Sequence, residues 1–80
     1  MRIISQDKTI DVNYDAVALV ICPDVFDDAV GHVIKALGYA AFVTEIGKFS
    51  TKERAKEEME RIRTRYAEGW PIYDIRKEET

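Results

Sequence analysis

The pattern of apolar and polar positions changes along this chain from strand-like to helix-like. Thr9-Ile10-Asp11-Val12 alternates polar and apolar residues, as a half-buried strand does, and it follows the isoleucines Ile3 and Ile4 across a polar turn. These two segments predict a short hairpin or meander. Residues 16–22 are continuously apolar and rich in β-branched side chains, which predicts a central strand. We expect Pro23 to end that strand, because proline has no N–H for the ladder.

Residues 25–37 carry two conflicting patterns. Their apolar side chains recur at helical spacing, while Asp24 suits a helix cap and Gly38 suits a helix end. The same segment contains residues that favour a strand or disfavour a helix: Val30, Gly31, Val33 and Ile34. The residues alone leave helix and strand as alternatives.

A single amphipathic helix is predicted in the last third of the chain. Ser50-Thr51-Lys52-Glu53 has the form of a capping box with Ser50 as the N-cap, and we expect a helix over residues 51–68. Its predicted packing face is spaced at intervals of four, three and four residues: Ala55, Met59, Ile62 and Tyr66. Gly69 suits a left-handed helix end, and residues 70–75 predict an extended tail that covers the core or a sheet edge.

These segments together predict an α+β fold in one domain of residues 1–80. We expect an antiparallel sheet, from residue 2 to about residue 48, packed on one C-terminal amphipathic helix. Eighty residues with 46% apolar side chains suffice for one modest core, and they are too few for a large enclosed cavity.

Charge and composition exclude several classes of function. The chain has 12 Lys and Arg against 15 Asp and Glu, a net charge of -3, which disfavours nucleic acid as a partner. Its longest apolar run, residues 16–22, is far shorter than the roughly 20 residues of a membrane span, so we expect no membrane insertion. The opening residues lack the apolar run of a signal peptide, and Cys22 is the only cysteine. We therefore expect an intracellular protein.

Candidate catalytic and metal-binding residues are few. His32 is the only histidine, and its spacing from Cys22 matches no known thiol and base signature. Five potential metal ligands lie within eleven residues: Cys22, Asp24, Asp27, Asp28 and His32. Their spacing fits neither a zinc finger nor a calcium loop, and a solvated acidic turn explains the carboxylates better than a metal site does. We predict no enzymatic activity, no cofactor and no metal.

Two segments are candidates for contact with a protein partner. The first combines an aromatic residue with three acids, and its alternative role is a solvated turn: Asp24, Phe26, Asp27 and Asp28. The second is the tail after the helix, where Trp70 and Tyr73 are either partner contacts or side chains that cover the core.

The opening Met1-Arg2-Ile3-Ile4-Ser5-Gln6-Asp7, continued by Thr9-Ile10-Asp11-Val12-Asn13-Tyr14-Asp15, resembles a group of small uncharacterised phage and prophage proteins of Gram-positive bacteria. The resemblance resumes at Phe49-Ser50-Thr51-Lys52-Glu53-Arg54-Ala55 and Met59, and it covers about half of the chain. Lys8 stands where glycine is common in that group, and Asn13 stands where proline is common. The resemblance implies strands before the helix, and hence a strand over residues 30–36. It implies no catalytic residue.

From these observations we expect a non-enzymatic phage or mobile-element accessory protein in the cytoplasm of a bacterial host cell. It would bind a host protein, such as a component of a defence system. The alternative is a homo-oligomer that binds or sequesters a small molecule in a pocket between subunits. We also expect a homodimer or larger assembly, because one sheet face and one helix stripe leave large apolar side chains exposed.

Overall fold

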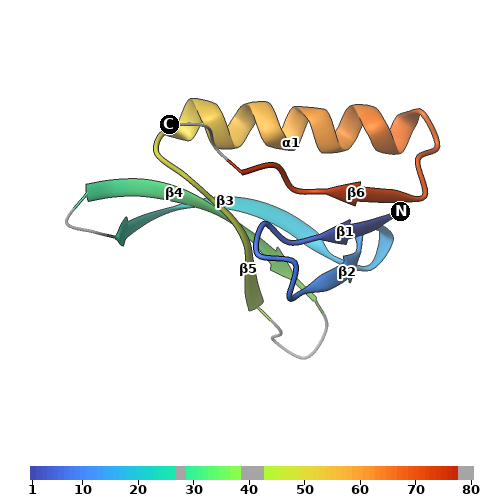
Figure 1. Cartoon of the computed structure of the whole chain (residues 1–80), viewed down its shortest axis with the longest axis horizontal. Helices are drawn as coiled ribbons and strands as arrows, with labels where there is room; N and C mark the ends of the chain where they lie inside the picture. Colours follow the sequence, from blue (N-terminus) through green and yellow to red (C-terminus); the bar gives the residue numbers. More distant parts are fainter. Residues whose placement is uncertain (27–28, 39–42, 78–80) are drawn as a thin grey trace.

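The structure is a computed structural model that describes residues 1–26, 29–38 and 43–77. The elements in chain order are β1 (Arg2–Ile4), β2 (Asp11–Asn13), the short 3-10 helix η1 (Tyr14–Ala16), β3 (Ala18–Phe26), β4 (Ala29–Leu37), β5 (Val43–Phe49), α1 (Lys52–Ala67) and β6 (Ile72–Asp74). Helix α1 and strand β6 lie on one side of the long β3–β4 hairpin (Figure 1). The predicted α+β class, with one helix packed on strands, is confirmed.

The described strands divide between two three-stranded sheets, in the orders β2-β1-β6 and β3-β4-β5, where we predicted one antiparallel sheet. Strands β1 and β2 form the predicted antiparallel hairpin. Strand β6 pairs with the other edge of β1 in parallel, since it returns after the α1 crossover. The predicted tail therefore covers a sheet edge. The backbone N–H of Gln6 donates to the Ile46 carbonyl over 2.9 Å, which joins the first sheet to β5.

Residues 25–26 and 29–37 belong to two paired strands, so the helical alternative for this segment is wrong. Strands β3 and β4 pair from Ala18 with Leu37 to Phe26 with Ala29, and the strand expected over residues 30–36 is confirmed as β4. Pro23 does not end β3, which runs on to Phe26. The prediction of a central strand was wrong as well. Strand β3 is an edge strand, where a proline is tolerated because its missing N–H need not face a partner strand.

The cap of α1 lies one residue later than predicted. Thr51, in extended backbone conformation, accepts a hydrogen bond from the Arg54 N–H through its side chain over 3.1 Å, so Thr51 is the N-cap and not Ser50. The shift arises because the last extended residue before the helix supplies the capping oxygen. Gly69 has φ of 83°, as predicted for a left-handed helix end.

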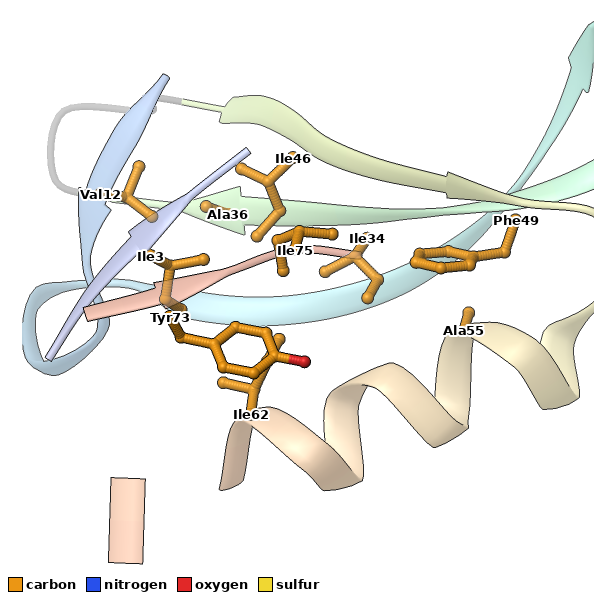
Figure 2. Close-up of a cluster of buried hydrophobic side chains, with 10 residues drawn as sticks. All are labelled: Ile3, Val12, Ile34, Ala36, Ile46, Phe49, Ala55, Ile62, Tyr73 and Ile75. Atoms are coloured by element: carbon orange, nitrogen blue, oxygen red, sulfur yellow. The ribbon is translucent and has the colours of Figure 1, made fainter. Parts of the chain in front are cut away.

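The core lies between α1, the β2-β1-β6 sheet and one face of the β3-β4-β5 sheet (Figure 2). Its buried side chains come from every layer: Ile3, Val12, Ile34, Ala36, Ile46, Phe49, Ala55, Ile62, Tyr73 and Ile75. Gly47 suits this packing, because an added Cβ would lie 3.0 Å from both Ile75 and Phe49 and these side chains would have to shift. Tyr66, which we predicted on the packing face of the helix, is 42% exposed. Glu58, which we did not place on that face, is buried.

Candidate functional site

The predicted partner-binding residues fall at separate ends of the molecule. Asp24 lies near the end of β3, with its Cα opposite Gly31 of β4. Phe26 is the last residue of β3, while its side chain and both Asp27 and Asp28 lie outside the described residues. The C-terminal end of α1, which precedes Trp70, is at the opposite end of the long axis (Figure 1). The two candidate segments therefore do not form one surface.

The structure also separates Trp70 from Tyr73. Trp70 is 47% exposed, and the Arg65 guanidinium lies over its ring at 4.8 Å from the centroid. Tyr73 is 4% exposed and its side chain points toward α1 beside Ile62 (Figure 2). Tyr73 thus has the core-covering role, and Trp70 stays available at the surface.

The face of the β3-β4-β5 sheet that points away from α1 is apolar. Strand pairing places Leu19 and Ile21 with the core residues Ala36 and Ile34, so the alternate residues face outward. We call this the outer face; its apolar members are Ala18, Val20, Cys22, Val33, Leu37 and Val43. Val33 is fully buried, Val20, Cys22 and Leu37 are half-buried, and Val43 is 55% exposed.

The buried apolar side chains of α1, β1, β2 and β6 belong to the core cluster on the other side of the sheet. Charged residues lie within the outer face as well as at its end: Lys35, on the central strand β4, pairs with Val20 on one side and Glu45 on the other, and Asp24 lies toward the end of β3. The outer face thus mixes apolar side chains with charged ones.

Cys22 and His32 lie on opposite faces of the sheet and cannot act as a thiol and base pair. Cys22 pairs with Val33 on the outer face, whereas His32 pairs with Pro23 and Phe49 and shares the face of Ile34. His32 Nδ1 is buried without a hydrogen-bond partner among the described residues. Those residues also contain no cluster of three or more His, Cys, Asp or Glu side chains that could hold a metal ion.

A buried carboxylate ties α1 to the segment after β6. Glu58 is 2% exposed, and its Oε2 accepts hydrogen bonds from the Tyr73 hydroxyl at 2.6 Å and the Arg76 N–H at 3.1 Å. Its Oε1 accepts from Arg76 Nε at 3.0 Å and lies 2.9 Å from Arg76 Nη2. Burial and the hydrogen bond to Glu58 raise the pKa of Tyr73 well above its ordinary value. Both carboxylate oxygens are therefore satisfied inside the fold.

Sequence reasoning missed Glu58, although a signal was present. Position 58 is three residues after Ala55 and four before Ile62, so it lies on the packed face of the helix. A charge at such a position predicts a buried partner, and the partner segment follows β6 about 18 residues later.

Beside Glu58 is an open cavity of about 590 Å³. Phe49 and Ile75 line it but are only 4% and 1% exposed, and Arg76 is on its wall with a side chain that is 51% exposed. This volume is within the ordinary range for small-molecule sites. We expected any pocket to form between subunits, and this cavity lies within one chain.

Comparison of the chain with protein-family models, curated proteins and solved structures gives no significant match. Among the described residues, no helix is long and apolar enough to cross a membrane. The function is therefore argued from the geometry of the outer face.

Proposed function

We propose that this protein is a non-enzymatic phage or mobile-element accessory protein that binds a host protein through the outer face. The observation that carries the proposal is the outer face, on which the apolar side chains of Val20, Cys22 and Leu37 stay partly exposed and that of Val43 is 55% exposed. Accessible apolar side chains grouped on one sheet face are typical of protein interaction sites.

The charges around the outer face define the chemistry of the partner. Asp24 lies at the end near the β3–β4 turn, and Asp27 and Asp28 follow it in sequence. The matching partner surface combines apolar groups with basic groups at the end that meets Asp24, because opposite charges guide orientation and suppress wrong partners. Nucleic acid is disfavoured by the same acidic residues.

A host protein is the partner class supported by the opening residues. Residues 1–7 resemble small uncharacterised phage and prophage proteins of Gram-positive bacteria, and we expect such a protein to act in the cytoplasm of the bacterial host cell. A component of a host defence system fits this setting. The separation of Cys22 from His32 supports binding, and not thiol catalysis, as the activity.

The experiment is affinity capture from a lysate of a Gram-positive host, followed by reconstitution with the purified partner. We expect the wild-type protein to retain a host polypeptide and the Val20→Asp variant to lose it, because a carboxylate would replace one of the apolar side chains of the outer face. Thr64→Asp, on the exposed side of α1, is the matched control and keeps binding.

Circular dichroism must show that Val20→Asp is folded, and Val20→Thr serves as a milder polar variant of similar shape if it is not. Equal capture by wild type and folded variants would overturn the proposal. So would a multimer that carries a small molecule and no host polypeptide, which is the behaviour expected of the sequestering alternative.

A further inference from the structure

The β3-β4-β5 sheet has two edge strands, β3 and β5, and the chain itself covers part of the β5 edge. The Ile46 carbonyl accepts a hydrogen bond from the Gln6 N–H at 2.9 Å. The Gln6 side chain also donates to the Lys48 carbonyl at 3.0 Å and accepts from the Lys48 N–H at 2.7 Å. The β5 edge is therefore occupied from Ile46 to Lys48.

The same hydrogen bonds show which way the backbone of each strand points. Lys48 turns its N–H and carbonyl away from β4, so the next residue, Phe49, turns its own toward β4, where it pairs with His32. Because these directions alternate along a strand, Val33 turns its groups toward β3, where it pairs with Cys22. The alternate residues of β3 therefore point their backbone groups away from β4: Leu19, Ile21 and Pro23.

This edge of β3 is open. Among the described residues, no hydrogen bond outside the β3–β4 ladder involves the backbone of Leu19 or Ile21. Both side chains are half-buried, and those of Ala18 and Pro23 are exposed. Residues 16–23 carry no charged side chain. An uncharged edge strand with unpaired N–H and carbonyl groups is a template for pairing with another chain.

Pro23 limits how far such pairing can run. Leu19 and Ile21 each offer one N–H and one carbonyl, whereas Pro23 offers a carbonyl alone. An added strand forms a complete ladder with residues 19–21 and is weakened at Pro23. Its side chain opposite Val20 lies on the outer face, because directly paired residues share a face of the sheet. A partner that contacts the outer face can thus continue onto this edge.

We propose that an extended segment of the host protein adds to the free edge of β3 as a further strand. Hydrogen bonds to the backbone of Leu19 and Ile21 give affinity, and an apolar side chain of the segment beside Val20 extends the contact with the outer face. This mode of binding rests on the proposed function, and it names the kind of segment bound and the backbone groups that bind it.

The edge suits a host segment better than a second copy of this chain. In a two-fold antiparallel pair of β3 strands centred on Val20, the proline of each copy removes a donor, so the ladder is shortened at both ends. A host segment meets a single proline, at one end only.

The test is amide hydrogen exchange, followed by nuclear magnetic resonance, of the isotope-labelled protein alone and with the purified host polypeptide that the wild-type protein captures. We expect the amides of Leu19 and Ile21 to exchange roughly tenfold more slowly in the complex. The amides of Val20 and Cys22 point toward β4, so they are internal controls that are protected in both states.

Ile21→Pro removes one outward N–H, and Pro23 shows that an outward position of β3 accommodates proline. Ile21→Ala is the matched control, because it removes most of the same side chain and keeps the N–H. We expect the host polypeptide to bind Ile21→Pro roughly tenfold more weakly than Ile21→Ala. If the proline variant does not fold, the exchange measurement on the wild type decides the matter.

The outcomes separate this proposal from the one on which it rests. A captured polypeptide that Val20→Asp releases, without slower exchange at Leu19 and Ile21, would overturn the edge pairing and leave binding by the outer face intact. No capture by the wild type would overturn both. Slower exchange of the same two amides as the protein alone is concentrated would assign the edge to a second copy, which also contradicts the proposal.

Discussion

At the residue scale, the buried side chain of Glu58 joins α1 to β6 and to the segment that follows it. One carboxylate connects α1 to a hydroxyl of β6 and to both the backbone and the guanidinium of Arg76. A buried charge is retained only when its hydrogen bonds are complete, and here both oxygens are engaged. Gln6 makes a similar connection between layers, because its side-chain amide donates to the carbonyls of Lys48 and Arg76 at 3.0 Å.

We predict that Glu58→Gln lowers the free energy of unfolding by about 1–3 kcal/mol. The glutamine amide has one acceptor oxygen where the carboxylate has two, and its hydrogen bonds to Arg76 and Tyr73 are no longer strengthened by a negative charge. Urea denaturation measures the change. Glu60→Gln is the matched control on the same helix, where an exposed pair with Arg63 should contribute less than about 1 kcal/mol. Tyr73→Phe should be destabilising too and non-additive with Glu58→Gln. Equal effects of the two glutamine variants would contradict the role of Glu58.

Asp7 should make the fold sensitive to acid. Hydrogen bonds from the Thr9 side chain, the Ser5 side chain and the Thr9 N–H lower the pKa of Asp7 from 3.8 to about 2. Because the folded-state pKa is the lower one, the contribution is present above pH 3.8 and is lost as the pH falls through about 2. Carbon-detected titration of the Asp7 carboxyl should give a midpoint near 2. Asp7→Asn should flatten the fall in stability over this range, and a midpoint near 3.8 would refute the prediction.

At the element scale, α1 is specified by signals within its own sequence, and the β3–β4 pair is specified by contacts between its two strands. Helix α1 is defined by local signals: a capping threonine, apolar residues at helical spacing and a glycine at its end. The β3–β4 hairpin is defined by pairing along nine residues of each strand, and this pairing overrides the helical spacing of residues 25–37.

We predict that Thr51→Ala destabilises the protein by about 1 kcal/mol, because the Arg54 N–H loses its capping acceptor. Thr64→Ala is the matched control: the same substitution on the exposed side of α1 should be neutral or slightly stabilising, since alanine favours the helix. Thermal unfolding followed at 222 nm compares the two. A loss in Thr64→Ala as large as that in Thr51→Ala would argue against the cap.

At the whole-molecule scale, the core lies on one face of the β3-β4-β5 sheet. α1 and the β2-β1-β6 sheet share the core face, whereas the outer face and the neighbourhood of Trp70 leave apolar groups exposed. An assembly that covers such surface gains free energy in proportion to the apolar area that it buries.

We predict a homodimer or larger assembly at micromolar concentration, formed through the edge near Val43 or through the Trp70 tail. Light scattering should give at least twice 9.2 kDa for the wild type. Val43→Asp or Trp70→Ala should reduce the mass, according to which surface forms the contact. A wild-type mass near 9.2 kDa would reject the dimer, and Trp70→Ala should then only lower the stability of the monomer.

The sequence by itself determined the class of the fold, α1, the β1–β2 hairpin and the extended tail, because caps, spacing and turn residues act within a few positions of one another. The tertiary structure alone decided three matters. It resolved residues 25–26 and 29–37 as parts of two paired strands, it divided the strands between two sheets through the parallel β1–β6 pair, and it placed Tyr73 inside and Trp70 outside. It also assembled the candidate cavity, whose walls come from residues 6 to 77, because charges so distant in sequence become neighbours only after the chain has packed.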